Sequence, residues 1–472
     1  MTTSMEQKED ASAALARSVV NARYENINPK TREVAKRSIF DLLGVMMAAS
    51  GVGAAGCKEI ASLVKEAGGK GESTVVGFGY KVPCWMAAFV NGSMAHTLDM
   101  EDVLDEAYNH PGIGTIPAAL AMAERQGDVS GKEFITAVVS GEEIVCRLGL
   151  AVSRRPKGWK HDWMITTVFG VFSNAAAAGR LLGLNHEQML NAFGIAFAHA
   201  AGTMELGSAD NVMRGLYGGL PAWSGAISAL MAQRGISGMK NSLEGKNGLF
   251  NIYFQGEYDR ESLTKGLGET FELDRLSFKA WPSCRDTHAY IEATLSIIRE
   301  HAVRPEQIKK ITVFIGPETV KVDLCEPLPK RQKPQTVSDA KYSIPWTVAC
   351  AAAAGKVIIK DFTEEGIKDP GRLALASKVA VSYDTALNDV HRVAPGRVEI
   401  NTNEGGVFIK QVDFPYGSPE NPMSSEELVR KFKDCLAYRV KPLSPKNMDK
   451  VVELLTHLEQ VDNVSRVIEL LK

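Results

Sequence analysis

The chain has 472 residues, of which 45% are apolar and 23% are charged, a composition typical of globular proteins. Its 54 basic and 56 acidic residues give a formal net charge of −2, so there is no broad cationic surface for nucleic acid or anionic lipid. The length exceeds what one hydrophobic core usually organises, so we expect two domains, or one domain with a large insertion.

The cysteines and the apolar segments set further limits. The seven cysteines are scattered and form no CxxC or CxxH pair, so we expect reduced thiols and no metal. The N-terminal segment mixes charges of both signs and lacks the apolar stretch of a secretory signal. The longest apolar run, from Trp346 to Ala354, is too short to cross a bilayer. We therefore expect a cytoplasmic protein with no nucleic-acid or membrane partner.

From about residue 10 to residue 265 the sequence predicts helices almost throughout. Alanine-rich apolar stripes alternate with short Gly, Pro or Asn interruptions, and the many small residues indicate closely packed helices. Three helix starts carry capping signals, at Asn28 before Pro29, at Ser130 with Glu133, and at Asn185 with Gln188.

After about residue 268 the pattern changes to short strands separated by helices. Alternation predicts strands at 308–316, 378–384, 397–403 and 407–414, a hairpin turn at 403–406, and helices at 284–301 and 338–355. Beyond Pro415 capped helices return. The predicted fold is mainly α with an inserted α+β domain. A helical domain would comprise residues 1–270 and 415–472, the smaller domain residues 271–414, and a cleft would form between the two.

Common sequence motifs give little support for other enzyme classes. Residues 51–56 match GxGxxG, but they follow a helical pattern instead of a strand, so we interpret them as a helix-terminating loop. The P-loop, GxSxG and HExxH patterns are absent, which argues against a serine hydrolase or a zinc peptidase.

The densest polar cluster lies in AHTLDMEDVLDEAYNHPG, after an apolar helical stretch. His96 and Asp99 fall three residues apart on one helical face, and a carboxylate can orient an imidazole for proton transfer. Asp102 and His110 belong to the same cluster. The alternatives are a solvated acidic surface, or a divalent-metal site completed by ligands from elsewhere.

A second cluster, SFKAWPSCRDTHAYIEA, surrounds a proline turn at the expected domain boundary. It contains Lys279, Cys284, Arg285 and His288. A lysine and an arginine at a helix start make a suitable seat for a carboxylate. The alternative is a structural role for all four.

Two further regions place basic residues in loops between helices. Residues 155–180 contain Lys160 and His161, and residues 204–225 contain Arg214. Taken separately, each of these residues is more often a surface residue than a functional one.

These four regions, in this order, resemble proteins of the MmgE/PrpD family over nearly the whole chain. The resemblance rests on NGSMAHTLDMED followed by HPG, SGKEFITAVVSGEEIVCRLG, FGVFSNAAAAGRLLGL, KAWPSCRDTH and SDAKYSIPWTVA. It implies a helical domain built from both chain ends, an inserted α+β lid, and a homodimer. The family includes 2-methylcitrate dehydratase, cis-aconitate decarboxylase and iminodisuccinate epimerase.

The resemblance also implies roles for individual residues. Asp99 and His110 match the family's active-site aspartate and histidine, and Lys279 matches its lid-side lysine. Cys284 lies where some members have histidine and others cysteine. In two places the chain departs from the family: Met164 falls where a histidine is usual, and Arg214 where a lysine is usual. Arginine clamps a carboxylate but does not readily exchange a proton.

We therefore predict a cofactor-independent lyase that abstracts a proton next to a carboxylate of a small di- or tricarboxylic acid. A dehydratase is the first choice; an epimerase, a decarboxylase or a silent dicarboxylate-binding relative is the alternative. Lys279 and Arg285 would hold carboxylates and stabilise enolate charge. His110 would be the acid/base, oriented by Asp99. The second proton donors would be Cys284 and His161, and the other substrate-binding residues Arg214, His288, Asp102 and His96.

Overall fold

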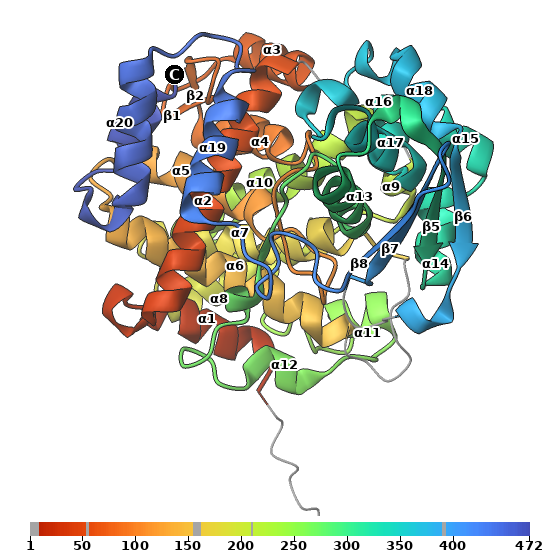
Figure 1. Ribbon diagram of the computed structural model, residues 1–472. Helices are drawn as coiled ribbons and strands as arrows, with labels where there is room; N and C mark the ends of the chain where they lie inside the picture. The colour runs from red at the N-terminus through yellow and green to blue at the C-terminus, as the bar shows by residue number, and fades with distance from the viewer. Residues whose placement is uncertain (1–8, 53–55, 154–161, 209–210, 389–392) are drawn as a thin grey trace, which may run out of the picture. The chain divides into compact units, whose positions relative to one another are not determined.

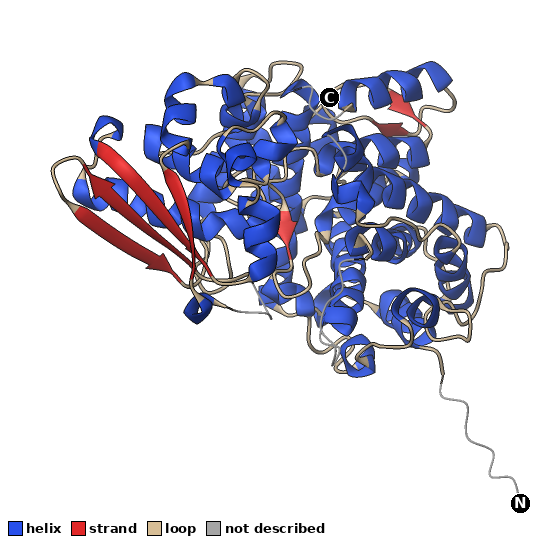
Figure 2. Ribbon diagram, turned by 90° about the vertical axis from the view of Figure 1, so that its right-hand side faces the viewer, coloured by secondary structure: helices blue, strands red, loops and turns tan. Residues whose placement is uncertain are grey.

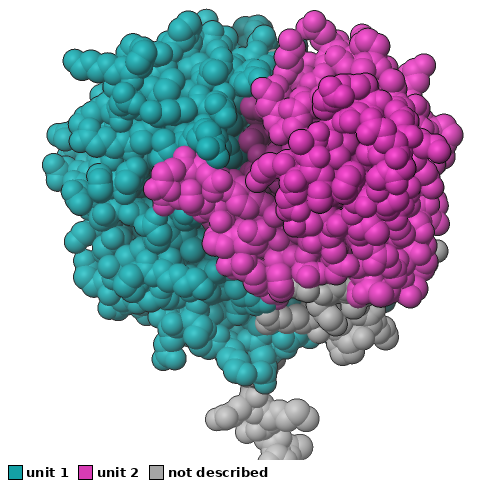
Figure 3. All heavy atoms as spheres, in the orientation of Figure 1, with its two compact units in different colours: residues 1–97, 107–276, 429–472 teal, residues 98–106, 277–428 magenta. Residues whose placement is uncertain are grey.

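The computed structural model describes residues 9–52, 56–153, 162–208, 211–388 and 393–472. They form two compact units. Unit 1 comprises residues 1–97, 107–276 and 429–472, and unit 2 comprises residues 98–106 and 277–428 (Figure 3). Helix predominates, with one four-stranded sheet in unit 2 (Figures 1 and 2), so the predicted mainly α fold with a smaller α+β part is confirmed.

Unit 1 is built from closely packed helices that combine both ends of the chain. Its longer helices pack through small residues, and α4 and α10 approach each other at Gly92 and Gly218. A Cβ atom added at Gly92 would lie 2.7 Å from the carbonyl oxygen of Gly218, so only glycine permits this approach. The main helices of unit 1 are α1 (Ala11–Asn21), α2 (Pro29–Val52), α3 (Cys57–Ala67), α4 (Cys84–Ala95), α5 (Gly112–Gln126), α6 (Gly131–Ser153), α7 (Ile165–Leu181), α8 (His186–Phe197), α9 (Glu205–Ser208), α10 (Asn211–Gln233), α11 (Leu249–Phe254), α12 (Arg260–Thr264), α20 (Pro445–Thr456) and α21 (Ser465–Leu470).

The predicted helix starts of unit 1 are confirmed. Asn185 and Gln188 form a reciprocal capping box, and Asn28 accepts a hydrogen bond from the backbone N–H of Thr31 at 2.9 Å. Ser130 and Glu133 also bond reciprocally. These caps satisfy backbone N–H groups that a helix start leaves unpaired.

Unit 2 contains a mixed sheet in the order β6-β5-β7-β8, in which β5 and β6 are parallel and the other pairs antiparallel. β7 alternates buried and half-buried residues along its whole length, as expected of a strand with one face on a core. Helices α13 and α17 contribute to that core, and Trp346 of α17 is among its fully buried side chains. The strands are β5 (Ile308–Ile315), β6 (Val379–Tyr383), β7 (Gly396–Thr402) and β8 (Val407–Val412), and the helices are α13 (His288–His301), α14 (Glu318–Cys325), α15 (Leu328–Gln332), α16 (Val337–Lys341), α17 (Ile344–Ala354) and α18 (Pro370–Ala376).

The predicted helical segment 338–355 is confirmed, but a break divides it into two helices, α16 and α17. Ser343 caps the second helix by accepting a hydrogen bond from the N–H of Trp346 at 3.0 Å, and Pro345 has no N–H with which to continue the first. The break therefore follows from local chemistry that an apolar pattern alone conceals.

The boundaries of the two units differ in detail from the expected ones. The chain passes from unit 1 to unit 2 at residues 276–277 and returns at residues 428–429, inside α19 (Ser425–Leu436). Residues 98–106, which lie within the predicted helical domain, belong to unit 2. Among the described residues, no single helix is long and apolar enough to span a membrane; only α2 and α3 together, bent by 89°, pass that test of length and composition.

Candidate active site

The acid-rich segment after α4 joins unit 2 through a short two-stranded ribbon. Strand β3 (Asp102–Val103) pairs antiparallel with β4 (Ser277–Phe278), with Asp102 opposite Phe278. This pairing brings Lys279 into contact with Asp99, although the two residues are 180 positions apart in the sequence. It explains why the first predicted cluster meets the second.

Lys279, directly after β4, is buried next to two acidic side chains. Its ammonium forms an ion pair with the Asp99 carboxylate, donates to the Asp99 carbonyl at 3.3 Å, and lies 3.8 Å from Glu101 Oε1. Lys279 is 1% exposed, Asp99 2% and Glu101 0%. Burial alone would lower the pKa of Lys279, but Asp99 and Glu101 outweigh it and raise that pKa. The buried Lys279 is therefore charged at neutral pH.

Asp99 has an unusual backbone conformation. Its φ is 56°, in the left-handed region that few residues except glycine, asparagine and aspartate occupy. Next to it, the Met100 N–H donates to Glu101 Oε2 at 2.9 Å. Conformations of this kind collect at functional sites, where the surrounding structure enforces them. The turn directs both carboxylates toward one ammonium.

Arg285 has internal partners. Its guanidinium donates to Asp105 at 3.1 Å and to the carbonyls of Tyr416 at 2.9 Å and Pro415 at 3.2 Å, and Ser277 also donates to Asp105, at 2.6 Å. These bonds link the β3–β4 ribbon to residues 415–416 and supply the acceptors that a buried guanidinium needs. The predicted role of Arg285 in holding a substrate carboxylate stays a prediction.

His288, the first residue of α13, is 0% exposed and packs against Trp281 with ring centroids 5.1 Å apart. Burial, together with the charges of Arg285 and Lys279, keeps its pKa well below the ordinary value. A neutral imidazole brings no positive charge to a carboxylate, and it could contact one only as a hydrogen-bond donor. The substrate-binding role of His288 stays a prediction.

Unit 1 carries a second group of predicted site residues. His96 ends α4, and its ring lies 4.9 Å from the ring of His110 and 5.1 Å from that of Tyr217, centroid to centroid. The backbone N–H of His110 donates to Thr166 Oγ1 at 3.2 Å. Arg214 precedes Tyr217 by three residues on α10, which places both on one helix face, and it is 7% exposed. The close approach of α4 to α10 sets this arrangement.

For the remaining predicted residues the structure gives a position but no contact that indicates a catalytic role. Asp102 is buried in the β3–β4 ribbon, and Met164 is the N-cap of α7, with its N–H bound to the carbonyl of Gly202. His161 and Lys160 lie outside the described residues.

Four residues near the predicted ones were not predicted as site residues. Glu101, Asp105 and Tyr217 have partners distant in the sequence, whereas Asp286 contacts the neighbouring Cys284. The dense acid run was the only signal for the first two.

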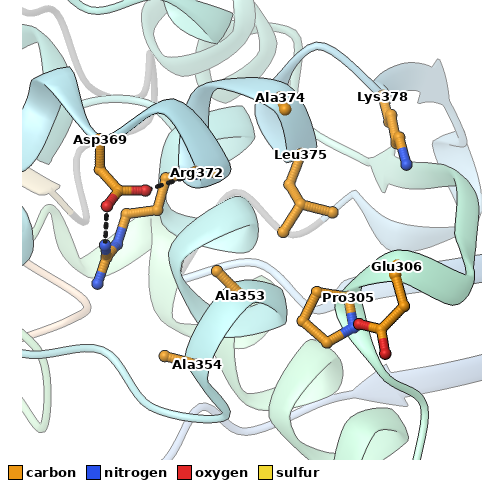
Figure 4. Close-up of a pocket in the computed structure, with 10 residues that line it drawn as sticks. Pro305, Glu306, Ala353, Ala354, Asp369, Arg372, Ala374, Leu375 and Lys378 are labelled. Atoms are coloured by element: carbon orange, nitrogen blue, oxygen red, sulfur yellow. Dashed lines mark hydrogen bonds and ion pairs between the residues drawn. The ribbon is translucent and has the colours of Figure 1, made fainter.

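The carboxylates of unit 2 that suit a metal ion are already balanced by a cation. Asp99 and Glu101 face the Lys279 ammonium, and a divalent ion there would have to displace it. Away from this cluster, unit 2 has a cavity of about 450 Å³ that none of the predicted residues lines (Figure 4). In it Arg372 pairs with Asp369 at 3.1 Å, and Lys378 donates to the carbonyl of Ile308. Its charged groups are thus engaged.

Comparison with known proteins defines the class to which this fold and these clusters belong. Residues 13–261 match the MmgE/PrpD N-terminal domain, and residues 281–457 match the MmgE/PrpD C-terminal domain. The chain belongs to the MmgE/PrpD family.

Curated relatives cover most of the chain. It is 26% identical to a cis-aconitate decarboxylase of Aspergillus terreus over 420 residues, 85% of this chain and 84% of the relative. It is 27% identical to the cis-aconitate decarboxylase of Homo sapiens over 402 residues, which are 83% of this chain and 80% of the relative. It is 26% identical to the cis-aconitate decarboxylase of Mus musculus over 451 residues, which are 93% of this chain and 88% of the relative.

Proposed function

We propose that this protein is a lyase that acts on a small polycarboxylic acid by proton transfer at a carbon next to a carboxylate, with decarboxylation of a cis-aconitate-like acid as its first candidate reaction. One structural observation carries the proposal: Lys279 is kept charged in the protein interior by Asp99 and Glu101. The relatives named cis-aconitate decarboxylase favour decarboxylation over the dehydration that the sequence put first.

The chemistry requires a cation and a proton donor. When a carboxylate leaves as CO₂, the electron pair of the broken C–C bond stays on carbon and is delocalised toward a neighbouring carboxylate. Preorganised cations that hold that carboxylate lower the barrier most when they lie in a dry site. Lys279 and Arg214, both buried, are the cations that we assign to this role.

The second requirement is a group that delivers a proton to the resulting carbanion. Protonation completes the reaction. The C–C bond breaks and releases CO₂, and the added proton forms a C–H bond at the same carbon. Imidazole is a common acid/base group in proteins, and the rings of His110 and His96 lie 4.9 Å apart, centroid to centroid. Three peptide units separate His96 from Asp99, so covalent geometry keeps their Cα atoms within about 11 Å. We assign His110 as the donor and His96 to its support.

The test is a screen of small di- and tricarboxylic acids, cis-aconitate among them, followed by proton NMR in deuterium oxide. Decarboxylation would give CO₂ and one new C–D bond, whereas elimination would give a new alkene, and epimerisation would give exchange without net loss. Elimination or epimerisation would replace the decarboxylase assignment. No change with any acid would contradict the proposal itself.

The homodimer implied by the family resemblance stays a prediction. Light scattering on the purified full chain measures the mass directly, and a single chain of 51.2 kDa would contradict it.

A further inference from the structure

We propose that Tyr217 is a positioning residue, whose aromatic ring holds the His96 imidazole in the orientation in which it supports His110. The inference rests on the proposed function, in which His110 delivers the one proton that the reaction requires. Tyr217 adds no proton donor and acts on the chemistry through His96.

The helix that carries Tyr217 lies close to the segments that carry both histidines. Gly218, the next residue of α10, lies against α4 and α5. A Cβ atom added at Gly218 would lie 2.4 Å from the carbonyl oxygen of Gly92 in α4, and 2.9 Å from that of the second residue of α5. His96 directly follows α4, and His110 precedes α5 by two residues. A glycine at this position therefore allows the close packing that sets the location of Tyr217.

Two ring contacts connect Tyr217 with the proposed proton donor. The Tyr217 ring is stacked on the His96 imidazole, with centroids 5.1 Å apart and planes inclined by 25°. The His96 ring in turn lies 4.9 Å from the His110 ring, with an interplanar angle of 53°. Tyr217 and His96 are each only 2% exposed. Because a close-packed interior leaves a stacked pair little room to turn, the stack fixes the plane of the His96 ring.

The start of α7 holds the backbone of both Tyr217 and His110. The Thr167 hydroxyl donates to the Tyr217 carbonyl at 3.3 Å, and Thr166 Oγ1 accepts the backbone N–H of His110 at 3.2 Å. These threonines are adjacent in the sequence and both are buried. Tyr217 and His110 are therefore anchored to the same helical turn, which keeps the Tyr217 ring in place beside His96.

The stack matters for the reaction because a proton donor has to face the carbanion. A misplacement of about 1 Å in a catalytic group can cost about 100-fold in rate. Without the Tyr217 ring, the His96 imidazole gains room to turn, and the His110 ring loses a fixed neighbour. The substrate carboxylates are assigned to Lys279 and Arg214, so we expect the loss to appear in kcat more than in KM.

The kinetic test compares full-length wild type with Tyr217→Leu and Tyr217→Phe, using cis-aconitate as the probe. Leucine keeps an apolar side chain on the helix but removes the stacked ring, so kcat should fall at least about tenfold. KM should change less than about threefold. Phenylalanine keeps the ring and should retain kcat within about twofold. An equal loss of kcat in both variants would overturn the proposal, because the hydroxyl and not the stack would then be responsible.

A double-mutant cycle tests whether Tyr217 acts through His96. In a His96→Asn background, Tyr217→Leu should lower kcat by less than about twofold more, because no imidazole remains for the ring to hold. An undiminished loss in that background would contradict the proposal.

Phe193→Leu is the matched control for the loss of a buried aromatic ring. Phe193 is buried in unit 1, and its ring pairs with that of Phe172 at 6.1 Å between centroids. Its substitution should lower the melting temperature but leave kcat unchanged. A loss of kcat as large as that of Tyr217→Leu would contradict a specific role for Tyr217.

NMR gives a readout that depends neither on turnover nor on the folding of a Tyr217 variant. The chain has 9 histidines, so labelled histidine gives a simple spectrum, in which His96→Asn identifies the His96 signal. Stacking on Tyr217 predicts an upfield ring-current shift of the His96 ring protons in wild type. Ring protons at the position of an unstacked histidine would contradict the proposal.

The outcomes separate the two proposals. A wild type that turns over no acid contradicts the proposed function, and the positioning role falls with it. A wild type that turns over the probe, with Tyr217→Leu active within about twofold, contradicts only the positioning role.

Discussion

Replacing Lys279 by Met removes the buried cation and leaves Asp99 and Glu101 facing each other. Methionine has a similar length and is apolar, so packing changes little. At the observed 3.8 Å between Lys279 and Glu101, two unit charges attract by about 4 kcal/mol at an effective dielectric constant of about 20. Breaking a buried ion pair on one side typically costs about 3–5 kcal/mol, and we expect a loss of that size in the stability of unit 2.

The pH dependence of this loss has a definite sign. The folded pKa of Lys279 is raised, so its contribution is fully present below the ordinary lysine value of 10.5 and is lost only as pH rises through the folded value. Wild type therefore keeps this stabilisation throughout pH 5–9. In Lys279→Met the loss should shrink toward acid pH, because the two abandoned carboxylates then take up protons.

Urea unfolding followed by tryptophan fluorescence measures the effect, since unit 2 contains Trp281 and Trp346. Lys410→Met is the matched control, because Lys410 pairs with Glu300 at 2.7 Å on the surface of the same unit and should contribute less than about 1 kcal/mol. Equal effects of the two substitutions at pH 7 would refute the reasoning.

Three further predictions concern other parts of the molecule. Asp286→Asn should stabilise the protein above pH 6. Because the pKa of Asp286 is raised to about 6, wild type loses stability as pH rises from 3.8 through about 6, by at most about 3 kcal/mol and less with partial exposure. Denaturation at pH 4 and pH 8 tests this, and an equal difference at both would contradict it. His110→Asn should lower kcat at least about 100-fold in the NMR assay, and activity within a few-fold of wild type would remove the assigned role. Gly92→Ala should cost about 1–3 kcal/mol in thermal unfolding, because its Cβ meets the Gly218 carbonyl, and an unchanged melting temperature would show that α4 and α10 separate freely.

The sequence predicted well the features that depend on nearby residues. The capping signals at Asn28, Ser130 and Asn185 are local, and so is the alternation that predicts β7, so each could be read from a few positions. The break within the helical segment 338–355 was not predicted, because its apolar pattern outweighed Ser343 and Pro345, whose local effect is to end one helix and start another.

The candidate site was only partly predictable, for a different reason. Strands β3 and β4 are two residues long each, too short for any periodicity, and they pair across a wide stretch of sequence. Without that pairing, nothing indicates that Glu101 faces Lys279 or that Asp105 neutralises Arg285. Residue types suggested which side chains are chemically useful, but their partners are set by tertiary structure.

The most direct test of proton transfer next to a carboxylate uses purified wild type and cis-aconitate in deuterium oxide, with His110→Asn as the comparison. We predict release of CO₂ by wild type with one deuterium on the carbon that carries the new hydrogen, and at least about 100-fold slower release by the variant. CO₂ release without deuterium at that carbon, or equal rates for the two proteins, would contradict the account.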